Sequence, residues 1–221
     1  MSDAIKKDEL TAIPLFTAPV FMIDKPEFLK TAKKVAKKFI AKRKTESCLN
    51  PAYPVYMTEN MNYDPEMQDF ANYIAQTAWN ILKEQGYAME HFNTYFESMW
   101  CQEHHTMSLM ERHIHGNGVV MTGFYFLDCP KESSRVIFHD PRDAKVISNL
   151  PETNMANGTH ASNMINFEPK EGQLMFSNSW LPHSFTKNEA KKPMRFIHFN
   201  IAVAQAQPQH TCSTKPTAEV I

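Results

Sequence analysis

The stretch HIHGNGVVMTGFYFLD, residues 113–128, contains two features from which the organisation of the chain can be worked out. Val119–Leu127 is rich in β-branched and aromatic residues, which is typical of a strand. A Gly-Asn-Gly turn precedes this strand, and His113 and His115 lie just before the turn. Side chains at positions i and i+2 of an extended segment point to the same side, so both imidazoles can reach one ion. The chain has 10 histidines, so this pair alone indicates a metal site only weakly.

The second half of the chain contains further segments of the same kind, separated by turn residues. The strand-like segments are Phe92–Gln102, Val119–Leu127, Val136–His139, Gln173–Ser177 and Arg195–Val203. The polar stretch from Asp140 to Pro169 interrupts them and indicates a lid, an insertion or disorder.

The first half of the chain predicts one strand and two helices. Leu15–Ile23 is strand-like, and Asp24 is the expected cap of a helix with Pro26 in its first turn. The second helix has Asp64 as its cap and ends at Gly86. Helices followed by many short strands predict an α+β fold, with the helices packed on one side of a double-stranded β-helix, or jelly roll.

The composition limits the kinds of protein that this chain can be. The chain has 221 residues, 43% of them hydrophobic, which predicts a domain over residues 1–204 with a sizeable core. We expect a flexible polar tail over 205–221. A net charge of −1 favours neither a nucleic-acid nor a membrane partner, and no apolar run is long enough to cross a membrane. Four scattered cysteines and a polar N-terminus predict a cytoplasmic protein with free thiols.

The first predicted helix carries many basic residues over positions 26–44. They indicate either a surface for an anionic partner or a solvated helix face. We favour the solvated face, because acidic residues elsewhere in the chain balance the charge.

Two residues far downstream strengthen the metal-site interpretation. His183 follows the strand-like segment FSNSW and a Leu-Pro bend, so it can approach the first histidine pair from another strand. Arg195 opens the last strand-like segment, and a guanidinium there can form a bidentate pair with a carboxylate.

Four stretches, in this order and spacing, resemble a known family. They are HIHGNG (113–118), TGFYFLD (122–128), EGQLMFSNSWLPHSF (171–185) and MRFIHFNIAV (194–203). Residues from about 110 to 203 resemble the catalytic core of the 2-oxoglutarate- and Fe(II)-dependent oxygenases. They are most similar to the prolyl-hydroxylase-like branch and its small bacterial and phage relatives.

The resemblance implies a dioxygenase that hydroxylates a substrate and releases succinate and CO2. It implies that His113 and His183 bind Fe(II) and that Arg195 holds the distal carboxylate of 2-oxoglutarate. It also implies that Thr122 and Tyr125 line the cosubstrate pocket. The partners would then be 2-oxoglutarate, dioxygen and a peptide or small molecule that the sequence does not name.

The chain departs from the family pattern at His115, where relatives have Asp or Glu. His115 can itself be the second ligand, because imidazole suits Fe(II). Asp140 can instead supply a carboxylate from a neighbouring strand, or the position can be open to water or an anion. We favour His115, because it occupies the ligand position in the motif.

Further expectations concern the surroundings of the metal. Arg142 and Trp180 are candidate substrate contacts. Along the last strand, side chains alternate between faces, so Arg195 and His198 cannot both face one cavity unless the strand bulges. Two rival interpretations are a three-histidine, cupin-like dioxygenase that needs no 2-oxoglutarate, and a non-catalytic jelly-roll binding or structural protein.

Overall fold

The computed structural model describes residues 13–147 and 150–206. Most of the predicted tail lies outside the described residues. Three α-helices are α1 (Leu29–Glu46), α2 (Gln68–Glu84) and α3 (Asp143–Ile147). The strands are β1 (Val20–Asp24), β2 (Val55–Met57), β3 (Phe92–His104), β4 (Met110–His113), β5 (Val119–Asp128), β6 (Val136–His139), β7 (Met164–Phe167), β8 (Gln173–Asn178), β9 (His183–Phe185) and β10 (Met194–Gln205).

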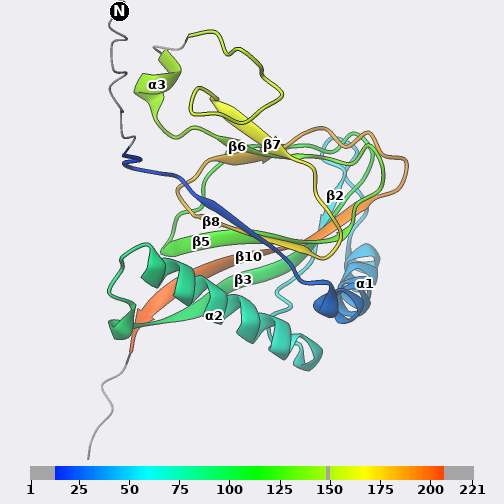
Figure 1. The fold of residues 1–221 in the computed structure, drawn as a ribbon. Coiled ribbons are helices and arrows are strands. Elements are labelled where there is room, and N and C mark those ends of the chain that lie inside the picture. The colour runs from blue at the N-terminus through cyan, green and yellow to red at the C-terminus, as the bar shows by residue number, and fades with distance from the viewer. Residues whose placement is uncertain (1–12, 148–149, 207–221) are drawn as a thin grey trace, which may run out of the picture.

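The strands form two antiparallel sheets that face each other, as Figure 1 shows. The larger sheet has the order β1-β8-β5-β10-β3-β2, and the smaller one has the order β4-β9-β6-β7. An apolar cluster with side chains from both sheets fills the space between them, including Phe124, Phe196 and Phe185. The predicted jelly roll is thereby confirmed.

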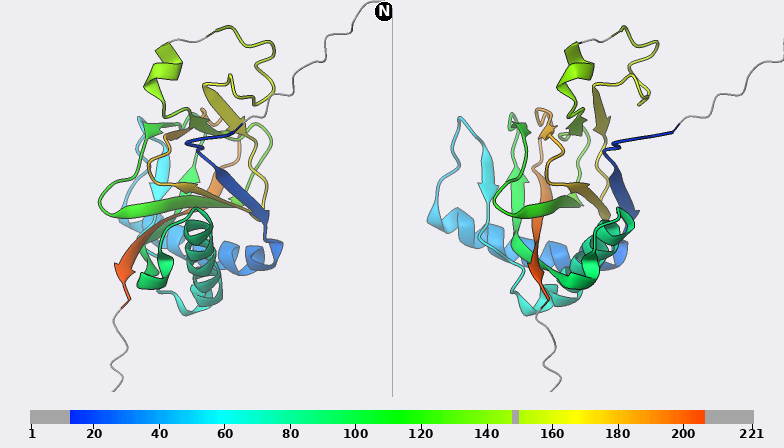
Figure 2. Two further views of the ribbon diagram at one scale, coloured as in Figure 1. Left: turned by 60° about the vertical axis from the view of Figure 1, so that its left-hand side comes forward. Right: turned by 90° about the vertical axis from the view of Figure 1, so that its left-hand side faces the viewer.

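Helices α1 and α2 cover the other face of the six-stranded sheet (Figures 1 and 2). Asp64 caps a 3-10 turn, Pro65–Met67, that leads directly into α2, because its carboxylate accepts from the Glu66 amide. The helix stops before Gly86, as predicted, and Gly86 has a φ of 95°. The prediction for Asp24 was wrong. Asp24 is the last residue of β1, and a short 3-10 turn, Pro26–Phe28, leads directly into α1.

Strand β10 lies in the middle of the larger sheet, paired with β5 and β3. Its side chains alternate between the two apolar layers. Met194 and Phe196 belong to the cluster between the sheets, whereas Ile197 and Phe199 belong to the cluster under the helices. His198 therefore faces inward, toward the smaller sheet, and Arg195 faces the helices.

The basic residues of α1 form ion pairs with acidic residues of neighbouring segments. The pairs are Lys33 with Asp128 and Glu171, Lys34 with Glu66, Lys38 with Asp64, Lys42 with Glu59, and Lys44 with Glu103. This pattern agrees with the solvated-face interpretation, because the charge of this helix face is largely neutralised within the chain.

The polar stretch from 140 to 169 contains the short helix α3 and the edge strand β7. The part that carries α3 projects from the end of the smaller sheet, away from α1 and α2 (Figure 2). Among the described helices, none combines the length and the apolar character that crossing a bilayer requires.

Candidate metal centre

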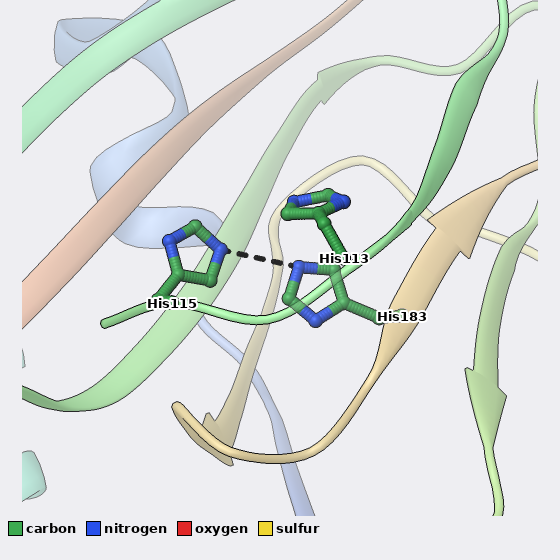
Figure 3. Close-up of side chains that lie close together, drawn as sticks. All are labelled: His113, His115 and His183. Atoms are coloured by element: carbon green, nitrogen blue, oxygen red, sulfur yellow. Dashed lines mark hydrogen bonds between the residues drawn. The ribbon is translucent and has the colours of Figure 1, made fainter.

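Three imidazoles converge at one end of the smaller sheet. His113 ends β4 and His183 begins β9, and the two residues are directly paired across these strands. His115 lies two residues beyond β4, where its amide donates to the Ser179 carbonyl. One nitrogen of each ring lies within 4.8 Å of the others, and Figure 3 shows the three rings turned toward one another.

The backbone orients two of these rings. The Nδ1 atom of His113 lies 2.8 Å from the Glu111 carbonyl, and that of His183 lies 3.0 Å from the Leu181 carbonyl. A carbonyl oxygen only accepts, so each Nδ1 carries the proton and each Nε2 presents a lone pair. Metal-binding histidines are oriented in this way in known sites.

His115 completes the cluster through its Nε2 atom, 3.3 Å from Nε2 of His183 (Figure 3). Burial lowers the pKa of His183 to about 3 and that of His115 to about 4, and the neighbouring His113 adds to both shifts. Both rings are therefore neutral near pH 7, which is the form that binds a metal. A divalent ion can take the place of the proton that His115 shares with His183.

Asp140, the alternative ligand, is not part of this cluster. Its carboxylate forms a bidentate pair with Arg142, at 2.9 and 2.7 Å, and lies 3.5 Å from Lys145. These cations lower the pKa of Asp140 to about 2. The structure thus brings together His113, His115 and His183, with the Asp140 carboxylate held by other partners.

The structure contradicts the predicted position of Arg195. Its guanidinium lies on the helix-facing side of the larger sheet, 2.6 Å from the Glu103 carboxylate and 3.0 Å from that of Asp128. Tyr125 faces the same side, where its hydroxyl donates to the Lys25 carbonyl. A sheet separates both side chains from the histidine cluster, so neither lines a cosubstrate pocket there.

Thr122 does face inward, and it lies beside His198, for which the sequence predicts no function. Its hydroxyl oxygen is 2.9 Å from Nε2 of His198, and the other ring nitrogen of His198 is 3.3 Å from the Gln102 amide. The His198 ring packs 5.0 Å from the His115 ring. Burial and the neighbouring histidines keep the pKa of His198 well below its usual value.

A hollow of about 860 Å³ lies beside β6 and β7 of the smaller sheet. It is bordered by residues 13–18, by β6 and β7, and by Arg142. One wall is Phe138, whose ring lies 6.1 Å from that of His183. Trp180 does not line this hollow, and 43% of its surface is exposed just before β9.

Comparison with known proteins gives a family match over part of the chain. Residues 98–200 match the family described as "Putative 2OG-Fe(II) oxygenase". None of the curated proteins matches the chain.

Solved structures share the fold at low sequence identity. One is AviO1 from Streptomyces viridochromogenes Tue57, with 14% identity and a TM-score of 0.60 over 86% of this chain and 92% of that one. Another is the epimerase SnoN in complex with Fe3+, alpha ketoglutarate and nogalamycin RO, with 12% identity and a TM-score of 0.60 over 91% and 90%. A Pseudomonas putida prolyl-4-hydroxylase has 12% identity and a TM-score of 0.54 over 84% and 94%.

The family match covers the strands that carry the three histidines, and the fold extends over most of the chain. The matched part of the chain is therefore similar to the 2-oxoglutarate- and Fe(II)-dependent oxygenases, and the chain shares its fold with a prolyl-4-hydroxylase. This match agrees with the resemblance and with the class of enzyme and the two cofactors, Fe(II) and 2-oxoglutarate, that the sequence predicted.

Proposed function

We propose that this protein is a dioxygenase that binds Fe(II) through His113, His115 and His183 and hydroxylates a peptide or small molecule. The observation that supports it best is the convergence of three imidazole nitrogens within 4.8 Å. Two of them have their lone pairs oriented by backbone carbonyls. Fe(II) with bound 2-oxoglutarate supplies the chemistry, in which dioxygen and 2-oxoglutarate give succinate, CO2 and a hydroxylated substrate.

The residues of the chain bind, orient and exclude water. The three imidazoles would hold the metal ion and leave its other coordination positions for exchangeable ligands. Phe124 and Phe138 pack against the His183 ring, at 5.5 and 6.1 Å between ring centres, so water has little access from that side. Without a carboxylate ligand, the centre carries one more positive charge than the usual family site, which favours anionic partners.

We place the substrate in the hollow beside Phe138, with Arg142 at its border. The support is position, because this hollow reaches the aromatic wall of the histidine cluster. Trp180, exposed beside β9, is a second candidate contact. A cytoplasmic location is a further part of the proposal and rests on the scattered cysteines.

The test is an anaerobic titration of the metal-free protein with Fe(II) and then with 2-oxoglutarate, followed by exposure to oxygen. We expect one Fe(II) and one 2-oxoglutarate per chain, and succinate only when both are present. Binding of Fe(II) without any succinate would contradict the proposed reaction while leaving the metal site intact.

One observation favours a second candidate, the three-histidine dioxygenase that needs no 2-oxoglutarate. Arg195, the predicted carboxylate anchor, faces the helices instead of the metal. In this case the protein would consume oxygen with its substrate and form no succinate. A non-catalytic binding protein would consume no oxygen under either condition.

A further inference from the structure

The smaller sheet has two edge strands, β4 and β7, and they differ in how they are protected against pairing with another chain. An exposed edge is a template for an added strand, and charges, prolines and bulges are the usual protection. Strand β4 carries Glu111 and Arg112 and has an irregular register with β9. Strand β7, with the sequence Met-Ile-Asn-Phe, has no charge and no proline, and its register with β6 is regular.

The backbone of β7 presents hydrogen-bonding groups to its free side. In an antiparallel ladder, alternate residues bond to the neighbouring strand. The Asp140 amide donates to the Asn163 carbonyl where β6 and β7 begin to pair, and this bond fixes the alternation. Met164 and Asn166 therefore point their N–H and C=O groups outward, where none of the described strands pairs with them.

Strand β7 also borders the hollow of about 860 Å³. Another part of the wall is residues 13–18, which are exposed and form no hydrogen bond with the rest of the described chain. Figure 2 shows this segment, in dark blue, on the side of the molecule where β7 lies. An extended chain placed against β7 would find the backbone groups of residues 13–18 in the same hollow.

The charges and apolar groups of the hollow select the kind of chain that fits. Arg142 and Asp140 line it, but they form a bidentate pair with each other. Apolar side chains are exposed at its border, with fractions of 93% for Phe16 and 59% for Met164. A charged segment would lose hydration there without gaining a partner. The complementary segment is therefore uncharged and partly apolar.

We propose that β7 binds an uncharged, extended segment of a polypeptide as an added strand, and that this polypeptide is the substrate. The inference rests on the proposed function and decides between its two substrate classes. The free backbone groups of β7 favour a peptide, because a peptide offers matching donors and acceptors at the strand spacing.

The position of β7 separates docking from reaction. An added strand would lie three strand spacings, or about 14 Å, from β9, which carries His183. The docked residues are therefore too far from the metal to react. An extended chain advances about 3.3 Å per residue, so the reacting residue should lie about four or more residues away from the docked segment.

The first experiment selects ligands for the Fe(II)-loaded protein, without oxygen, from random peptides displayed on phage. The peptides are about 12 residues long, which is enough for a strand of ordinary length. We expect enrichment of sequences with a run of about four uncharged residues, rich in β-branched and aromatic side chains. Enrichment of charged sequences, or no enrichment, would overturn the proposal.

The second experiment tests whether the enriched peptides pair with β7. Asn166→Pro removes an outward N–H group, and proline is tolerated on the free side of an edge strand. Asn166→Ala is the matched control, because it also loses the side-chain contact with Arg135 but keeps the N–H group. We expect binding to Asn166→Pro to be about tenfold weaker than binding to Asn166→Ala. Equal binding would overturn the proposal.

Two checks keep this comparison decisive. Circular dichroism verifies that Asn166→Pro folds, and Met164→Pro with Met164→Ala repeats the comparison if it does not. Sedimentation of the protein without peptide should show a monomer. A dimer that Asn166→Pro dissociates would mean that β7 pairs with a second copy of this chain, which would also overturn the proposal.

The third experiment tests whether the docked polypeptide is the substrate. The enriched peptides are extended on each side by about eight random residues, enough to reach β9, and incubated with Fe(II), 2-oxoglutarate and oxygen. We expect mass spectrometry to find one added oxygen atom outside the docked segment. Oxygen within that segment, or none in the pool while succinate forms, would overturn the proposal. If no succinate forms under any condition, it is the proposed function that fails, and binding to β7 is still decided by the second experiment.

Discussion

The two faces of the six-stranded sheet use polar residues in opposite ways. On the face under α1, Arg195, Glu103 and Asp128 form a charged cluster that Lys33 and Lys44 of the helix extend. On the inward face of the same strands, the polar groups beside the candidate metal centre are imidazole, hydroxyl and amide. The sheet thus uses full charges to attach a helix and neutral groups next to the metal.

The difference follows from the surroundings of the charged groups on each face. Charged side chains under α1 pair with one another, and all of them except the buried Glu103 remain partly exposed to water, which makes their burial tolerable. Beside the histidines, a fixed cation would compete with a metal ion for ligands and for anions. A neutral inward face leaves the metal as the main positive charge in the pocket.

The largest expected effect is a loss of protein stability at low pH, caused by a buried imidazole on the inward face. Burial lowers the pKa of His104 to about 4, so its folded-state pKa lies below the usual value of 6.5. The unfolded chain then binds the proton first, and the stability is complete above about pH 6.5 and is lost as the pH falls toward 4. For His104 alone we expect a loss on the order of 3 kcal/mol in the free energy of unfolding. Urea unfolding of the metal-free protein at several pH values measures it. A His104→Leu variant with the same pH dependence would show that other groups are responsible.

Removal of one inward imidazole should abolish tight metal binding. His183→Ala deletes a ligand whose ring the backbone holds in place, so we expect Fe(II) affinity to fall about 100-fold or more. Anaerobic titration with Fe(II) provides the measurement. Asp140→Asn is the control outside the cluster and should bind Fe(II) as the parent does. A His183→Ala protein with undiminished affinity would refute the proposed centre.

Removal of the cation on the outer face should change stability and leave the metal site intact. Arg195→Met leaves the buried Glu103 carboxylate with Lys44 and His105 as its remaining partners. We expect a loss of about 2 kcal/mol in the free energy of unfolding. Urea denaturation should show it, and a Glu103→Gln change in the same protein should recover part of the loss. If Fe(II) binding fell instead of stability, the two faces would not be separable.

The exposed ion pairs at the end of α1 should contribute least to the stability of the protein. Lys42 pairs with Glu59 and Glu46, and more than half of its side chain is exposed. Water and salt screen such pairs, so Lys42→Gln should shift the melting temperature by less than about 2 °C. Differential scanning calorimetry at low and high salt can verify this. A larger shift would mean that α1 depends on every one of its ion pairs.

The sequence predicted the features that depend on local order. The second helix could be predicted because Asp64 and Gly86 are local signals for its two ends. The grouping of His113, His115 and His183 could be predicted because the spacing of the motifs reflects the strand order of the jelly roll. The short strands β4 and β9, which hold His113 and His183, are stabilised by pairing with each other and gave no pattern of their own.

The face of β10 could not be predicted from its sequence. Alternation showed that Arg195 and His198 lie on opposite faces, but it did not show which face the helices cover. The acidic partners of Arg195 come from β3 and β5, far away in the chain. The place of His198 was missed for a related reason, since only the sheet register brings it beside Thr122. The one available signal was the polar His198 and Asn200 alternating with apolar neighbours.

His113 and His183 share one arrangement, in which each ring is held by the carbonyl two residues earlier on its own segment. Metal sites are often oriented by neighbouring carboxylates, which a single mutation can remove. Every residue type has a carbonyl, so substitutions at Glu111 or Leu181 leave these two supports in place. The residues around this centre can therefore diversify, and substrate preference can change during evolution, while the geometry of these two ligands is inherited intact.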